Sequence, residues 1–282
     1  MKHLPLSEKI AIVTGAGSPN GLGRSMTVAL VKAGARVCMV DVNDDWLHRS
    51  ADDIRKEWGE NSVITHLADL SDPRNAKSVV TNTINELGGL HILINNAGLL
   101  LRTNETSEYS RTSFWDVSPK TWVDTMAVNA NAPFFMAHAS APHMIQQKWG
   151  RIIGVTTSID SMYRQGLCPY GPSKASHEAL IALMSRELEG TGVTANVLIP
   201  GGTSDTNLIP QNIVSERSTL IKPQIMNAPA VWLASEESGS SNGQRIIAYN
   251  WDETLPIGQR LEKSSAPAAW PQLGQQSINP WS

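Results

Sequence analysis

Short runs of β-branched and other apolar residues recur along the chain at fairly even intervals. They lie at 9–14, 36–41, 62–67, 91–95, 151–156, 193–199 and 244–249. Runs of this length without regular polar positions are typical of strands that are buried on both faces, as in a parallel sheet. The pattern therefore predicts seven parallel strands.

Longer stretches with a helical spacing of apolar residues lie between these runs. They cover 21–34, 44–58, 72–88, 120–148, 173–190 and 223–236. Gly34, Gly88 and Gly190 are placed to end helices, and Asp72 before a proline is a start signal. Because strands and helices alternate, we expect an α/β fold: a doubly wound, three-layer sandwich with one parallel sheet between two layers of helices.

Three segments interrupt this alternation. Residues 99–119 and 202–222 follow the fourth and sixth predicted strands, at the edge of the sheet where ligands bind in such folds. Residues 253–282 are rich in Pro, Gln, Ser and Trp and show no periodicity. We therefore expect a single main domain, 1–252, and a C-terminal tail, 253–282, that docks onto the body or a neighbouring subunit or is partly irregular.

The composition narrows the class of partner. The 282 residues carry a net charge of -3, only 17% are charged, and there is no basic cluster. This argues against a nucleic-acid or membrane partner and favours small molecules or copies of the same chain. No eighteen consecutive apolar residues and no export signal occur, and Cys38 and Cys168 lack metal-ligand spacing. We expect a cytoplasmic protein with no bound metal and no disulfide.

The stretch "TGAGSPNGLGR" (14–24) leaves the first predicted strand and enters the first helix. Its glycines allow a tight turn, and a helix amino terminus offers free N–H groups to a pyrophosphate, so a dinucleotide site is predicted. Asp41 ends the second strand, where a carboxylate can accept both hydroxyls of an adenosine ribose. No Arg or Lys stands between Gly15 and Gly21 to accept a 2′-phosphate. NAD is therefore expected over NADP, with a plain surface acid as the alternative for Asp41.

Several short motifs share one order with a known family. "TGAGSPNGLG", "ADL" at 68–70, "NNAG" at 95–98, "VN" at 128–129, "YGPSK" at 170–174 and "IPGG" at 199–202 together make residues 8–252 resemble the short-chain dehydrogenase/reductase family. The resemblance implies a Rossmann-like sheet and hydride transfer between a nicotinamide cofactor and an alcohol or carbonyl. The cofactor contacts that it implies are Gly15, Asn20, Gly21, Leu22, Gly23, Asp41, Asp69, Leu70, Asn95, Ala97, Tyr170, Lys174, Pro200, Gly201 and Thr203. Asn95 and its neighbour Asn96 have a structural alternative, the satisfaction of buried backbone groups at a strand end.

Tyr170 and Lys174 form the expected reacting pair. Residues four apart share one face of a helix, and a neighbouring positive charge favours the phenolate form of a tyrosine. Tyr170 is then able to exchange a proton with the substrate oxygen as general acid/base. A packed tyrosine beside an exposed lysine is the structural alternative.

The substrate oxygen needs a second hydrogen-bond donor. The family usually places a serine thirteen positions before the tyrosine, and here that position is Thr157, with Ser158 next to it. A threonine hydroxyl has the same donor capacity, and a one-residue bulge would present Ser158 instead. Asn129 matches the asparagine that holds a water leading to the lysine, from a local helix distortion helped by Pro133. The structural alternative for Asn129 is an ordinary polar residue of a helix that faces a neighbouring element.

These expectations describe an NAD-dependent oxidoreductase acting on a medium-sized secondary alcohol or ketone. Pocket candidates are Trp115, Ser158, Tyr163, Cys168 and Leu208. A catalytically silent dinucleotide-binding protein on the same fold is the alternative function. Family members often pair across two long helices, so 120–148 and 173–189 are predicted to form the faces of a homodimer or homotetramer.

Overall fold

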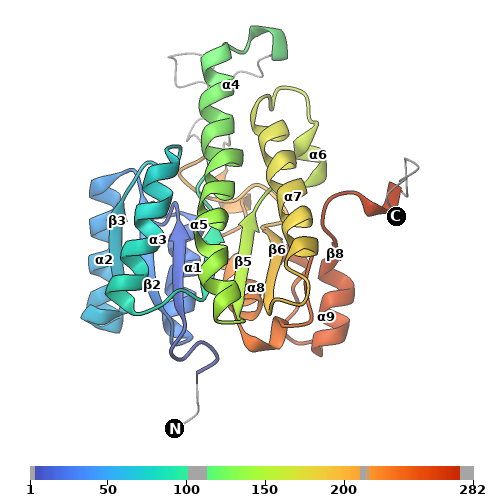
Figure 1. Ribbon diagram of the computed structural model, residues 1–282. Helices are drawn as coiled ribbons and strands as arrows, with labels where there is room; N and C mark the ends of the chain where they lie inside the picture. Colours follow the sequence, from blue (N-terminus) through green and yellow to red (C-terminus); the bar gives the residue numbers. More distant parts are fainter. Residues whose placement is uncertain (1–3, 101–112, 210–213, 215, 274–282) are drawn as a thin grey trace.

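One sheet runs through the centre of the computed structural model, which describes residues 4–100, 113–209, 214 and 216–273 (Figure 1). The strands are β1 (Ile10–Thr14), β2 (Arg36–Asp41), β3 (Val63–Leu67), β4 (Ile92–Asn95), β5 (Gly150–Val155), β6 (Val193–Ile199), β7 (Gln244–Ile247) and β8 (Ser265–Pro267). Their order is β3-β2-β1-β4-β5-β6-β7-β8, in which β8 alone of the described strands is antiparallel to its neighbour. The winding direction changes between β1 and β4, so a ligand crevice is expected at their carboxyl ends.

Helices cover both faces of this sheet. They are α1 (Leu22–Lys32), α2 (Asp44–Trp58), α3 (Pro73–Leu87), α4 (Pro119–Met126), α5 (Ala132–Gln146), α6 (Ile159–Met162), α7 (Tyr170–Glu187), α8 (Asn227–Leu233) and α9 (Ile257–Ser264). In Figure 1, α3, α5 and α7 lie in front of the sheet, and α4 projects beyond the carboxyl ends of the strands. The side chain of Asp72 caps the amino end of α3, and left-handed Gly88 ends that helix, as expected.

Two apolar cores result, one on each face. Alternate residues of β1 divide between them: Ala11 and Val13 pack with α1, α2 and α8, whereas Ile10 and Ile12 pack with α3, α5 and α7. This division follows from the two-residue period of a strand. It explains why the strands read as continuous apolar runs, and it confirms the doubly wound α/β class.

The sheet has one strand more than the seven predicted. β8 pairs along β7, with Ala266 opposite Arg245, and the preceding helix α9 packs Leu261 against a core. Within the described residues, the segment expected as a C-terminal tail thus contributes a helix and an edge strand, and its division from the main domain stays a prediction. Three residues ending in a proline give no strand signal, and Pro267 fits because an edge strand does not need every N–H.

The long helix predicted at 120–148 is interrupted once. Between α4 and α5, Ala127–Asn131 forms a π-helical turn. Pro133 has no N–H to donate to the carbonyl of Asn129 four residues before it, which gives a physical reason for the turn. The expected distortion at Asn129 is thus present. Among the described residues, no helix has the length and apolar character needed to cross a membrane.

Candidate active site

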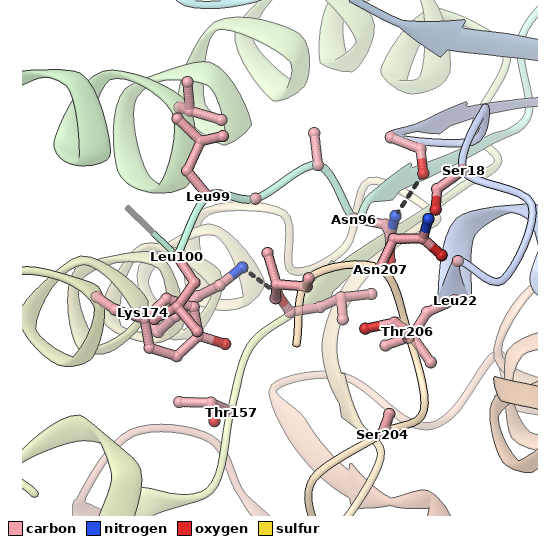
Figure 2. A pocket seen from close by; sticks show the side chains of 18 of the residues that line it. Ser18, Leu22, Asn96, Leu99, Leu100, Thr157, Lys174, Ser204, Thr206 and Asn207 are labelled. Carbon is pink, nitrogen blue, oxygen red and sulfur yellow. Dashed lines mark hydrogen bonds between the residues drawn. The ribbon is translucent and has the colours of Figure 1, made fainter. Parts of the chain in front are cut away.

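A cavity of about 940 Å³ lies at the carboxyl edge of the sheet. Residues at or after the ends of β1, β2, β4, β5 and β6 line it, so it occupies the crevice where the strand order reverses. In Figure 2, Lys174 and Thr157 lie on one side of this cavity, and Ser18 and Leu22 lie on the other. This volume is at the upper end of the range of about 300–1,000 Å³ for small-molecule sites. It gives room for a long ligand and a second molecule beside it.

The glycine turn fits a pyrophosphate. Gly21 is the N-cap residue of α1 and no side chain caps the helix, so the first N–H groups of this eleven-residue helix stay available. A Cβ on Gly23 would lie 2.3 Å from the carbonyl oxygen of Gly15, so only glycine lets the helix pack on the turn. The Nδ2 of Asn96 donates to that same carbonyl at 3.1 Å and fixes the turn from the β4 side.

Asp41 is held in one orientation by backbone groups. Its Oδ2 accepts from the N–H of Gly17 at 2.8 Å, and its Oδ1 accepts from the N–H groups of Val42 and Asn43 at 2.8 and 3.0 Å. The carboxylate lines the cavity and is half-buried. It is therefore preorganised to accept hydrogen bonds from a diol.

Helix α7 brings Lys174 to the cavity because it packs very close to β5. A Cβ on Gly154 would lie 2.7 Å from the Nε2 of His177, so a larger residue in β5 would push the helix away. In this arrangement the Nζ of Lys174 donates to the carbonyl of Val155 at 2.9 Å (Figure 2). Burial lowers the pKa of Lys174 to about 8. Tyr170 lines the same cavity one turn earlier on α7, so both members of the expected pair face it.

The hydroxyls of Thr157 and Ser158 differ in their surroundings. The Oγ of Ser158 lies 2.7 Å from the Oγ of Ser161, and a hydrogen bond from Ser158 lowers the pKa of Asp160. The Thr157 hydroxyl lines the cavity and has no hydrogen-bond partner in the described part of the chain. Of these two hydroxyls, the one of Thr157 is therefore available to donate a hydrogen bond to a substrate.

Asn129 lies behind the cavity wall and bridges two elements. Its Oδ1 accepts from the N–H of Leu99 at 2.7 Å, and its Nδ2 donates to the carbonyl of Leu99 at 2.9 Å and to the Oγ of Ser173 at 3.0 Å. It is fully buried in the π-helical turn. These contacts tie the segment after β4 to α7, and the expected water-holding role stays a prediction.

Most of the predicted site residues line the cavity. These are Gly15, Gly21, Leu22, Asp41, Asp69, Leu70, Ala97, Thr157, Tyr170, Lys174, Pro200, Gly201 and Thr203. Asn20, Gly23, Asn95 and Asn129 do not line it. Asn95 is buried with its Nδ2 donating to the carbonyl of Pro133, so at this strand end its neighbour Asn96 faces the cavity, as do Ala97 and Gly98.

Other residues of the site were not predicted. Thr14 joins β1 to the segment after β4, because its Oγ1 accepts from the N–H groups of both Asn96 and Ala97 at 3.0 Å. A hydroxyl residue immediately before the glycine turn was the available signal. Thr14 itself does not line the cavity, whereas Ser18, Arg164 and Thr206 do.

Two of the five pocket candidates, Ser158 and Leu208, lie on the cavity wall. Trp115 and Tyr163 are exposed away from it, and Cys168 does not line it. Residues 101–112 of the first polar segment lie outside the described residues.

Comparisons with known proteins agree with this geometry. A family model described as short chain dehydrogenase matches residues 9–215. The L-rhamnose-1-dehydrogenase of Scheffersomyces stipitis is 25% identical over 256 residues, covering 86% of this chain and 95% of that relative. The NADPH-dependent aldehyde reductase-like chloroplastic protein of Arabidopsis thaliana is 30% identical over 213 residues, covering 70% and 73%. The crystal structure of a dehydrogenase/reductase from Sinorhizobium meliloti 1021 has the same fold, with a TM-score of 0.73, 24% identity and coverage of 85% and 93%.

The match spans the glycine turn, the Tyr170–Lys174 pair and the strands that line the cavity. The relatives are named dehydrogenases and reductases, and nothing in these matches supports a catalytically silent protein. The chain therefore belongs to the short-chain dehydrogenase family and is an oxidoreductase that acts on alcohols and the corresponding carbonyl compounds with a nicotinamide cofactor.

Proposed function

We propose that this enzyme interconverts a secondary alcohol and a ketone with NAD, and that Tyr170 moves the proton at the substrate oxygen. The observation that carries this proposal is that Thr157, Tyr170 and Lys174 line the same cavity as Asp41. The nicotinamide, when bound, supplies or accepts the hydride at the substrate carbon. The chain provides the proton transfer and the orientation.

Each reacting side chain has one task. The Tyr170 hydroxyl gives a proton to the oxygen of a ketone, or takes one from an alcohol. The Thr157 hydroxyl donates a hydrogen bond to the same oxygen and stabilises the charge that develops on it. The buried ammonium of Lys174 favours the phenolate form of Tyr170. Asn129 supports Lys174 from behind by fixing the segment after β4 to α7.

Asp41 supports a preference for NAD over NADP. Among the described residues that line the cavity, the cationic ones are Arg164 and Lys174. Both belong to the segment after β5 and not to the end of β2, so neither would neutralise a 2′-phosphate placed at Asp41. One relative is named NADPH-dependent, which is a property of that protein. Comparing kcat/KM for NAD and NADP tests the preference here.

The Tyr170→Phe variant tests the chemistry. A panel of secondary alcohols and ketones, assayed with NAD and NADH, first identifies a substrate for the parent enzyme. The variant is expected to lose about 10²–10⁴-fold in kcat, while NADH titrated by fluorescence binds with an unchanged dissociation constant. Wild-type turnover in the variant would remove Tyr170 from the mechanism.

Two properties of the whole protein belong to the same proposal. Phe134 and Ile145 on α5 and Leu183 on α7 are exposed apolar side chains on the two helices expected to pair, which supports a homodimer or homotetramer. Monomeric elution on calibrated size exclusion at micromolar concentration would contradict it.

Cys38 and Cys168 are both free thiols. This supports a reducing, cytoplasmic location, which cell fractionation tests.

A further inference from the structure

Three consecutive residues at the end of β5 are each held by a buried polar group. Lys174 donates to the carbonyl of Val155, and the hydroxyl of Thr156 donates to the Oε2 of Glu178 at 3.0 Å. Lys174 and Glu178 are one turn apart on the same face of α7. The helix that carries the reacting lysine thus also holds the backbone that presents Thr157.

The third contact comes from another strand. Arg245, in β7, donates from one guanidinium nitrogen to the carbonyl oxygen of Thr157 and from another to the carboxylate of Glu178. Arg245 is 3% exposed and Glu178 is fully buried. The guanidinium group of Arg245 therefore joins the end of β5 to α7, and its ion pair with Glu178 is buried away from water.

The remaining oxygen of the ion pair is also satisfied. The Oε1 of Glu178 accepts from the N–H of Ala269 at 3.3 Å, just after β8 pairs with β7. A buried ion pair is weak support for stability, because apolar residues of similar size often do as well. A rigid, planar guanidinium is instead well suited to fix a carbonyl in one place.

We infer that the Glu178–Arg245 pair positions the Thr157 hydroxyl for the substrate oxygen. Both side chains are absent from the cavity wall, so they act through Thr157 and do not touch the substrate. The Thr157 hydroxyl has no partner of its own in the described part of the chain, so its direction depends on its backbone. This inference rests on the proposed role of Thr157.

The test removes both charges at once, because a single change would leave a buried charge unpaired and endanger folding. In E178Q/R245M, the glutamine oxygen can accept from the N–H of Ala269 and its Nε2 can donate to the Thr156 hydroxyl, whereas the Thr157 carbonyl loses its guanidinium donor. With NAD and a substrate found for the parent, kcat is expected to fall by about 10²-fold, as for other small misplacements in active sites. The NADH dissociation constant should stay within about twofold of the parent's.

The same two changes are then introduced into T157V, which lacks the hydroxyl. Since the pair acts through Thr157, they should lower kcat of T157V by no more than about twofold. A full additional loss in T157V, or an unchanged kcat in E178Q/R245M, would overturn the inference. If T157V itself keeps the parent's kcat, the proposed role of Thr157 fails first, and this inference falls with it.

Arg151 provides the matched control. It is a buried arginine at the opposite end of β5, where it donates to the carbonyls of Gly150 and Ser235. R151M should lower the melting temperature and leave kcat unchanged. An equal loss of kcat in R151M would show that any buried arginine of the sheet affects turnover, and would contradict a positioning role for Arg245.

Discussion

The Oδ2 of Asp41 accepts a hydrogen bond of 2.8 Å from the backbone N–H of Gly17, which joins the end of β2 to the glycine turn after β1. The second oxygen of Asp41 accepts from the two N–H groups that follow it. The carboxylate is thus fixed before any ligand arrives, and among the described residues of the cavity wall the cations, Arg164 and Lys174, both lie after β5 and not beside Asp41. Cofactor choice should depend on this one side chain.

Asp41→Ser should lower kcat/KM with NAD by roughly 10–100-fold, since a hydrogen bond to a charged group contributes about 1.5–3 kcal/mol. The value with NADP should rise, because the variant no longer repels a 2′-phosphate. Steady-state kinetics with both cofactors measures the change. Asp69→Asn, on the same cavity wall, is the control and should lower the NAD value without improving NADP. A parent enzyme that already prefers NADP would contradict the prediction.

Thr157 and Ser158 can be separated by matched variants. T157V keeps the shape of the side chain and removes the hydroxyl, so kcat should fall by about 10²-fold, the effect of removing one donor to a developing oxyanion. T157S restores the hydroxyl and should recover most of the rate. S158A should stay within about twofold of the parent, because its hydroxyl is directed to Ser161.

The opposite ranking, with S158A slow and T157V near the parent, would mean that the end of β5 shifts when substrate binds. Ser158 would then be the donor.

The class of fold was readable from the sequence because the central strands β1, β4, β5 and β6 are buried on both faces, and the others are apolar in part. Each appears as an apolar run, and helix signals such as Asp72 and Gly88 separate them. β8 was not readable, because its three residues form a strand only where the edge of β7 is available. Its pairing is a tertiary event that leaves no local pattern.

Residues of the cavity wall could be anticipated where a motif fixes the spacing, and not where only packing decides. Tyr170 and Lys174, which belong to the motif "YGPSK", both line the cavity. Asn95 and Asn96 are neighbours with the same side chain, and the pleat of β4 alone determines which of them faces the cavity. Glu178 and Arg245 are 67 positions apart, so their ion pair had no sequence signal.

His177 gives a prediction about stability. Its ring is fully buried, and neither nitrogen has a hydrogen-bond partner among the described residues. An unsatisfied buried polar group costs about 1–3 kcal/mol, so His177→Leu should raise the free energy of unfolding by a value in that range at pH 7.5. Denaturant titration measures it. A less stable variant would mean that bound water satisfies the imidazole in solution.

The same residue predicts a pH dependence. Burial, together with the charge of Lys174, lowers the pKa of His177 well below its ordinary value. The unfolded chain then binds a proton that the folded chain does not, so the parent should lose stability as the pH falls below about 6.5. The His177→Leu variant has no imidazole to protonate, so its free energy of unfolding should exceed the parent's by more at pH 5.5 than at pH 7.5. A constant difference between the two proteins across that range would contradict the assignment.

Lys174 should show a cost of the same sign at a higher pH, that of a buried charge kept for function. Its pKa is about 8 in the folded protein and 10.5 when the chain is unfolded, so the penalty is complete below about pH 8 and disappears as the pH rises to about 10.5. Lys174→Met removes a penalty on the order of 3 kcal/mol and loses a hydrogen bond worth about 1 kcal/mol. The ligand-free variant should therefore be inactive but more stable at pH 7, with a smaller advantage at pH 9.5. A variant less stable than the parent at pH 7 would mean that water reaches the ammonium, and that the lysine costs the fold little.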